Sequence, residues 1–314
     1  MQAWWCAALG FGSSLGAWLR DRLKDQGQRW RVAIVLILAV TLFSCGDRPS
    51  LVDAIKTAPA GPLVGAISEV APPAVIQRLA RDLDRYQPQV TIISPRADDV
   101  LQTDRVDVNL AVTGLPIFRD ETLGLGPHLR LWLDDQPYGD IYDLSQPIVL
   151  ENLTAGTHTL RAIALRPWQE SFKNEGAYAQ SSFHLFARSS HNQHDADQPL
   201  LTYNEPSGTY AAGQPVLLDF YLTNAPLHAI ARQDDSDEIK DWRIRATVNG
   251  ETFPIANWQA AYLQGFKPGK NWVKLELVDE AGKPLNPIFN ETVVALTIDR
   301  QPVDEPVNLS LIHI

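Results

Sequence analysis

The residue best placed for chemistry is Cys45, which directly follows a short apolar run. A basic segment precedes this run (residues 32–43, VAIVLILAVTLF), and this order of segments is typical of a secretory signal peptide. The residues Leu42-Phe43-Ser44-Cys45 fit a lipobox, in which the cysteine thiol is acylated and becomes the new N-terminus. Since the run is shorter than the about 20 residues that span a bilayer, we expect lipidation at Cys45. The alternative is an uncleaved anchor in which Cys45 is an incidental thiol.

Two segments carry side chains that could bind a metal ion. Residues 191–197 (HNQHDAD) offer imidazoles and carboxylates, but their spacing is loose and no second shell orients the imidazoles. Residues 234–238 (DDSDE) are dense in carboxylates, but they lack the glycine and the spacing of an EF-hand. We interpret both segments as solvated, and we predict no metal site and no cofactor.

A loop rich in aromatic and basic side chains is the candidate binding surface. Trp, Tyr and Arg dominate binding hot spots because they bury a large area at little cost in entropy, and loops at the end of a sandwich often carry function. The alternative is that these aromatic rings close the end of a core and seal a contact between domains. The candidate residues are Arg166, Trp168, Phe172, Lys173 and Tyr178.

Tryptophans offer a second kind of binding surface. Exposed indole rings on one face of a sheet can stack on sugar rings, but packing in the core is the alternative because strand residues alternate between inside and outside. These tryptophans, which lie in or near predicted strands, are Trp132, Trp242, Trp258 and Trp272.

Catalytic motifs are missing from the chain after the leader. Residues 45–314 contain no GxSxG elbow, no HExxH motif, and no phosphate-binding or dinucleotide-binding glycine pattern. Carboxylates are scattered over predicted strands and turns, and nothing in the sequence pairs two of them for acid–base work. We therefore predict a protein that is not an enzyme.

Charge and cysteine content exclude further classes. Of 27 basic and 37 acidic residues the leader holds 5 and 2, so residues 45–314 carry a net charge of −13. This charge disfavours nucleic acid and anionic lipid headgroups, so membrane attachment would depend on acyl chains at Cys45. Cys6 is the only other cysteine and lies in the leader, which excludes disulfides from the mature chain.

The elements that position these residues are predicted by alternation and by an internal repeat. From residue 90 onward, short segments alternate apolar and polar residues between turn signals, which is typical of antiparallel sandwiches. Residues 112–116 (VTGLP) match 222–226 (LTNAP), and 155–160 (AGTHTL) match 268–273 (PGKNWV). The offset of about 110 residues is the size of one immunoglobulin-like domain. We expect an all-β fold of two tandem immunoglobulin-like antiparallel β-sandwiches, preceded by a short amphipathic helix.

The expected helix, residues 71–88, has two possible roles. It is expected to pack against the domain that follows it or, alternatively, to bind a partner.

Composition and the repeat together divide the chain into segments. The final LSLIHI matches read-through of a sequencing adapter, so we expect the natural chain to continue. The predicted segments are a leader (1–44), a lipid-anchored tether (45–70), the helix (71–88), the first sandwich (89–190), a linker (191–199), the second sandwich (200–300) and a truncated tail (301–314), of which 309–314 is the adapter artefact.

Five segments of the chain carry a resemblance to known sequences. They are GPHLRLWLDDQPY, GTHTLRAIALRPWQESFKNEGAY, LDFYLTNAPLH, DWRIRATVNGE and GFKPGKNWVKLELVDEAGKPL. These segments resemble a conserved cyanobacterial family of lipoprotein-like proteins, and the resemblance covers roughly residues 71–297. It implies no catalytic residue, because no activity is assigned to that family, and it implies a chain facing the periplasm or the thylakoid lumen.

These observations predict a non-enzymatic, lipid-anchored extracytoplasmic binding or assembly module. Its expected partners are the membrane, through the lipid, and a protein that the sequence does not identify. The alternative is a module that binds carbohydrate or another envelope polymer through exposed tryptophans.

Overall fold

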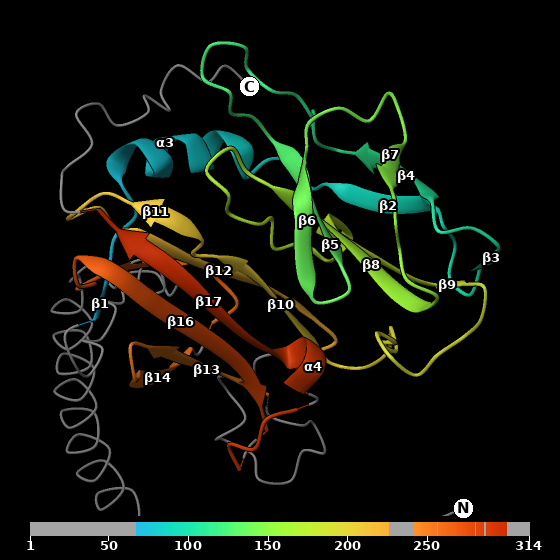
Figure 1. Ribbon diagram of the computed structural model, residues 1–314. Helices are drawn as coiled ribbons and strands as arrows, with labels where there is room; N and C mark the ends of the chain where they lie inside the picture. Colours follow the sequence, from blue (N-terminus) through green and yellow to red (C-terminus); the bar gives the residue numbers. More distant parts are fainter. Residues whose placement is uncertain (1–66, 226–241, 256, 280, 286, 300–314) are drawn as a thin grey trace, which may run out of the picture. The chain divides into compact units, whose positions relative to one another are not determined.

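The computed structural model describes residues 67–225, 242–255, 257–279, 281–285 and 287–299 (Figure 1). The leader, Cys45, most of the expected tether, the acidic segment 234–238 and the tail from residue 300 lie outside the described residues. All described residues belong to one compact unit, Ala60–Ile314. Within them, no helix combines the length and the apolar character needed to cross a membrane.

The first sandwich consists of two packed sheets. Their strands are antiparallel neighbours, except for a short parallel pair between β3 and β9. Leu131 and Leu160, which lie on adjacent strands, are fully buried in the core. One sheet has the order β2 (Gln89–Ser94), β4 (Val106–Thr113), β7 (Ile148–Leu150), and the other has the order β3 (Val100–Leu101), β9 (Tyr178–Leu185), β8 (Gly156–Leu165), β5 (His128–Leu133), β6 (Gln136–Ile141).

The second sandwich repeats this strand order, which confirms the predicted all-β class and the tandem arrangement. One sheet has the order β1 (Ser68–Val70), β15 (Ala261–Gln264), β12 (Val216–Thr223), β10 (Leu200–Glu205), and the other has the order β11 (Gly208–Tyr210), β17 (Glu291–Ile298), β16 (Gly269–Val278), β13 (Arg243–Val248), β14 (Glu251–Ile255). β11 pairs with β17 in parallel, as β3 does with β9.

Turn conformations confirm the repeat residue by residue. Gly114 and Asn224, which the sequence aligns, both have positive φ angles, of 75° and 53°. Gly156 and Gly269 begin β8 and β16, and they also share positive φ angles, of 130° and 97°. Glycine and asparagine tolerate this region better than other residues, so their recurrence marks equivalent turns.

The predicted helix forms as α3 (Ala74–Leu83) and packs on the fold. Pro73 is its N-cap residue, and the apolar positions Ile76, Leu79 and Leu83 are buried. They share a core cluster with the first sandwich and with residues of the second sandwich such as Leu217. The spacing of about 3.6 residues per turn therefore predicted the buried face correctly. Short helical segments elsewhere in the described residues are η1 (Glu175–Ala177) and α4 (Pro287–Asn290).

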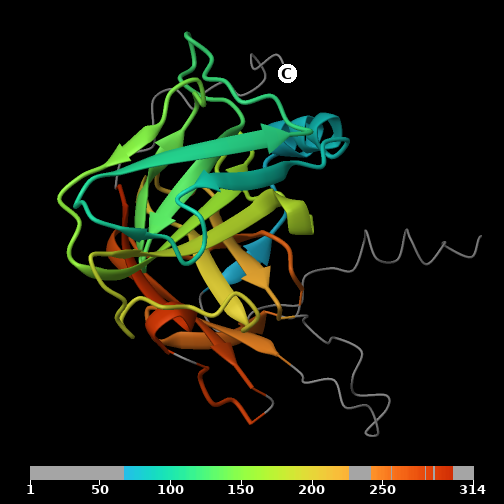
Figure 2. The same ribbon diagram turned by 90° about the vertical axis from the view of Figure 1, so that its right-hand side faces the viewer.

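The last residues of the expected tether form a strand instead. β1 pairs antiparallel with β15, with Glu69 opposite Leu263, and the neighbouring Ile67 is only 3% exposed in the core of the second sandwich. Figure 2 shows the blue strand β1 beside the orange strands of that sandwich. The chain thus contributes to the second sandwich before it builds the first.

The expected linker 191–199 is packed against its surroundings. His194 is 4% exposed, and its ring meets that of Phe289 edge-on at a centroid distance of 5.1 Å. The Thr159 hydroxyl donates to the Asn192 carbonyl at 2.7 Å, and the Asn224 amide donates to the Ala196 carbonyl at 2.5 Å. The interpretation of this segment as solvated is therefore wrong for His194, because contacts from both sandwiches cover it.

Candidate functional site

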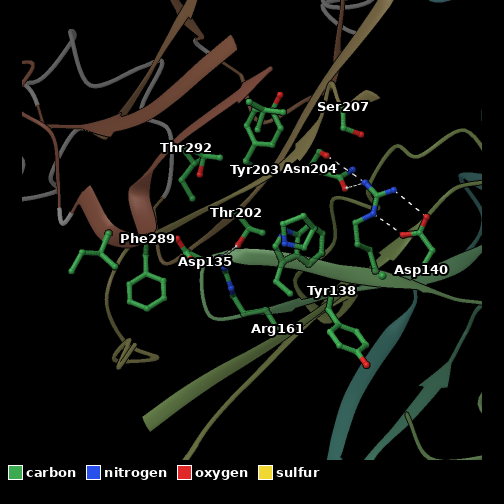
Figure 3. A pocket seen from close by; sticks show the side chains of 17 residues that line it. Asp135, Tyr138, Asp140, Arg161, Thr202, Tyr203, Asn204, Ser207, Phe289 and Thr292 are labelled. Atoms are coloured by element: carbon green, nitrogen blue, oxygen red, sulfur yellow. Dashed lines mark hydrogen bonds and ion pairs between the residues drawn. The ribbon is translucent and has the colours of Figure 1, made fainter. Parts of the chain in front are cut away.

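A pocket lies between the two sandwiches (Figure 3). Its walls come from the β5–β6 hairpin and β8 of the first sandwich, and from β10, α4 and β17 of the second. The cavity volume is about 320 Å³, which falls within the usual range of small-molecule sites. The lining residues include Arg130, Trp132, Tyr138, Arg161, Thr202 and Phe289.

Arg161 is a deeply buried cation of this pocket. It is 3% exposed, and its Nη1 donates to Thr202 Oγ1 at 2.9 Å (Figure 3). Its Nη2 donates to the Asp134 carbonyl at 2.6 Å. Its Nε has no hydrogen-bond partner, and no carboxylate of the described residues lies within 4.0 Å of the guanidinium. Burial lowers the pKa of Arg161, and the negative groups nearby oppose this only in part.

The alternation along β8 explains why this cation is buried. Leu160 and Ala162 point into the core of the first sandwich, so Thr159 and Arg161 point to the opposite face. Polar residues that alternate with apolar ones usually face solvent, but every residue of β8 is buried. The linker covers Thr159 and the second sandwich covers Arg161, so both faces of the strand are enclosed.

Arg130, by contrast, is fully paired. Its guanidinium donates to Asp140 Oδ1 at 2.7 Å and to Glu205 Oε1 at 2.9 Å, and Glu205 belongs to the second sandwich. Burial opposes the charge of Arg130, but hydrogen bonds and attraction from these carboxylates raise its pKa overall. The pKa of Asp140 is correspondingly lowered: burial acts against ionisation, and Arg130 outweighs it. This ion pair network fixes one wall of the pocket.

Asp134 orients the turn that holds Arg161. Its own φ is +59°, its Oδ1 accepts a hydrogen bond from the Thr159 amide at 2.9 Å, and its Oδ2 lies 2.9 Å from His158 Nδ1. The other ring nitrogen of His158 lies 2.9 Å from the Thr154 carbonyl. Because both neighbours accept, the Asp134 hydrogen bond above all raises the pKa of His158, although burial opposes it.

The stabilisation from His158 should decrease as pH rises. A raised pKa means that the folded state holds the proton more tightly than the unfolded state, whose histidine titrates near 6.5. The contribution is thus complete below about pH 6.5 and is lost as pH rises through the raised pKa. Urea unfolding of the native chain and of His158→Gln from pH 5.5 to 9 should show a stability difference that shrinks with pH. A constant or growing difference would contradict this account.

The predicted binding loop is buried, which corrects its assignment as an exposed surface. Trp168 is 8% exposed and Phe172 is 2% exposed, while Arg166 is 9% exposed and pairs with Asp84 at 2.9 Å. Lys173 contacts Asp219 of the second sandwich at 2.8 Å, and the Tyr178 ring stacks on Tyr221 at 5.2 Å. The loop seals the contact between the sandwiches, as the alternative held. The rings of Trp168 and Phe172 are buried because they pack in one hydrophobic core with side chains of α3 and β12.

The remaining candidate residues do not converge. His191 is exposed while His194 is buried, and the Asp195 carboxylate accepts from the Asp197 amide at 3.0 Å. Among the described residues, no three His, Cys, Asp or Glu side chains are grouped so as to hold a metal ion.

The four tryptophans are scattered as well. Trp132 lines the pocket and is 3% exposed, and Trp258 meets the Tyr221 ring edge-on at 5.1 Å. Trp242 packs against the second core, and of the four only Trp272 is exposed, at 38%. These four residues therefore form no continuous stacking face.

Sequence reasoning missed Arg161, although the repeat carries a signal for it. β8 and β16 have the same length and begin at equivalent glycines, so Arg161 aligns with Lys274. Comparing the neighbours of these two cations in the aligned copies would have shown that their surroundings differ.

Known proteins resemble this chain only weakly. No family model and no curated protein matches the chain. Fibronectin(III)-like modules of Clostridium thermocellum CbhA match at 13% identity and a TM-score of 0.24, covering 72% of this chain and 98% of theirs. The Bacteroides ovatus protein SGBP-B, in complex with a mixed-linkage heptasaccharide, matches at 13% identity and 0.21, covering 67% and 47%. The fibronectin-III array of RIM-binding protein matches at 8% and 0.23, covering 70% and 71%. At these scores the matches carry no functional argument.

Proposed function

We propose that this chain is a non-enzymatic binding module whose ligand, a saccharide, occupies the pocket between the two sandwiches. The observation that carries the proposal is the composition of this pocket. Its lining combines the Trp132 and Phe289 rings with the hydroxyl groups of Thr202 and Thr292. The Tyr138 ring points away from these side chains, and its hydroxyl donates to the Val149 carbonyl at 3.1 Å (Figure 3). Aromatic faces can pack against the C–H groups of a sugar, while polar groups fix its orientation.

The pocket suits binding better than acid–base catalysis. A general acid needs a raised pKa near the working pH, whereas the pKa of Asp140 is lowered by Arg130. The walls are also held in place by hydrogen bonds from both sandwiches, such as Asn204 Oδ1 with Arg130 Nη1 at 2.9 Å. A rigid pocket lowers the entropic cost of holding a ligand.

Removal of the Phe289 ring should weaken saccharide binding. We expect Phe289→Leu, which keeps an apolar side chain, to reduce affinity about tenfold, or about 1.4 kcal/mol, because an aromatic face of the pocket is lost. Calorimetric titration of the mature chain with a panel of defined oligosaccharides measures this change. Trp272→Ala is the matched control, since that exposed ring lies on β16 and does not line the pocket. Loss of binding in the Trp272 variant alone, with Phe289→Leu unchanged, would place the site on the sheet face instead.

We also propose that the module is held by lipid on Cys45 at a membrane facing the periplasm or the thylakoid lumen of a cyanobacterium. The support is the lipobox after a basic and apolar leader, together with the resemblance to lipoprotein-like sequences. Mass spectrometry of the mature N-terminus tests it: an unmodified Cys45 thiol in a chain that retains residues 1–44 would exclude the anchor.

A further inference from the structure

We infer that the saccharide is acidic, and that its oxyanion, a carboxylate or a sulfate, binds the guanidinium of Arg161. This inference rests on the proposed function and deepens it by naming the chemical class of the ligand. It depends on three observations: the unpaired state of Arg161, the loss of two carboxylates that its repeat equivalent has, and the neutralisation of the other arginine in the pocket.

The hydrogen bonds of Arg161 bring no carboxylate to its guanidinium, and attraction from the more distant Asp134 and Asp135 offsets the effect of burial only in part. Both partners, Thr202 Oγ1 and the Asp134 carbonyl, are neutral, and Nε has no partner. The Asp134 carboxylate faces the other way, toward His158 and the Thr159 amide. A buried cation without a counter-ion is unfavourable, and an anion bound in the pocket would remove that penalty.

The second copy of the repeat shows the paired form of the same position. The ammonium of Lys274 lies 2.9 Å from Glu276 and 3.0 Å from Glu291, which face each other across β16 and β17. In the first sandwich the equivalent facing pair on β8 and β9 is Ile163 and Tyr178. Both carboxylates are thus absent where Arg161 stands, so the cation is available to a ligand.

The other charges of the pocket do not supply a counter-ion. Arg130 takes up both Asp140 and Glu205 in its own ion pairs. Asp135, at the exposed tip of the hairpin, lines the pocket, but its carboxylate does not come within 4.0 Å of Arg161. A planar guanidinium binds carboxylate or sulfate oxygens through paired N–H groups, and the Phe289 ring, whose centre lies 5.9 Å from the Arg161 guanidinium, suits the sugar that carries them.

Matched pairs of acidic and neutral oligosaccharides test the inference. The mature chain would be titrated calorimetrically with oligomers of galacturonate, glucuronate and mannuronate, with their neutral methyl esters, and with sulfated and desulfated galactans. We expect at least one acidic member to bind about tenfold more tightly than its neutral counterpart, and the pair in which this occurs identifies carboxylate or sulfate as the group recognised. Arg161→Gln should abolish this preference, and Lys274→Gln, at the equivalent position, should retain it.

The outcomes separate this inference from the function on which it rests. Equal binding of acidic and neutral members, unchanged in Arg161→Gln, would overturn the acidic ligand and leave saccharide binding intact. No binding to any member would overturn both. If Arg161→Gln fails to fold by circular dichroism, Arg161→Lys retains the charge but loses the planar fork, and it should lower the preference for the acid. Inorganic sulfate should also compete with the acidic ligand on the native chain, and failure to compete would contradict the inference.

Discussion

Replacing Lys173 with methionine should destabilise the fold by about 3–5 kcal/mol. The Asp219 carboxylate is completely buried, and the Lys173 ammonium lies 2.8 Å from it across the contact between the sandwiches. That ammonium also donates to Ser171 Oγ at 2.8 Å and to the Phe220 carbonyl. Without it, the carboxylate would stay buried with no opposite charge. Urea unfolding of the native chain and of Lys173→Met measures the loss.

A double variant distinguishes the cost of leaving the Asp219 carboxylate buried without an opposite charge from the cost of losing the packing of the Lys173 side chain. Lys173→Met combined with Asp219→Asn removes the buried charge, so it should lose less stability than Lys173→Met alone. If the two changes simply add, or if the single variant loses less than about 1 kcal/mol, the ion pair does not hold the sandwiches together.

Truncating Phe172 to alanine should cost a similar amount, about 3–5 kcal/mol, because it leaves a cavity in the core. The ring is 2% exposed, and the Arg166 guanidinium lies 4.7 Å from its centre. Thermal and urea unfolding measure the effect. Phe186 is the matched control, since it is 47% exposed and Phe186→Ala should change stability by less than about 0.5 kcal/mol. A Phe172→Ala chain that melts normally but loses a protein partner would restore the loop as a binding surface.

The regular elements were predictable because their periods are local properties of the chain. Alternation in residues 106–112 and 128–133 corresponds to β4 and β5, and the apolar spacing around Ile76 and Leu79 corresponds to α3. The repeat also made the strand order predictable, because two copies of one pattern should form two sandwiches of the same topology. Aligned turn residues such as Gly114 and Asn224 both have positive φ angles, in agreement with this. Alternation reports which side chains share a face of a strand.

What alternation does not report is whether a second element covers the polar face. Arg161 and Thr159 have the pattern of solvated strand residues, yet the second sandwich and the linker cover them. The loop from Arg166 to Tyr178 was open to two interpretations for the same reason. Only the contact between two segments far apart in sequence, such as Lys173 and Asp219, decides that its rings are buried.

Short strands that complete a distant sheet are the least predictable. β1 has three residues, and its partner β15 lies almost 200 residues later. No periodicity can be recognised in so short a segment, so it was assigned to the tether. Its pairing depends on a free edge of the second sandwich, which the sequence around Ser68 does not encode.

The pairing of β1 limits the distance between the second sandwich and a lipid-anchored Cys45. If Cys45 carries lipid, residues 46–67 are the whole connection between the bilayer and the first strand. A chain of this length reaches at most about 80 Å when fully stretched, so β1 could lie no farther than this from the lipid. This connecting segment leads into β1, where Glu69 pairs with Leu263. A force transmitted from the membrane along the chain would therefore act on the backbone hydrogen bonds between β1 and β15 before it reached α3.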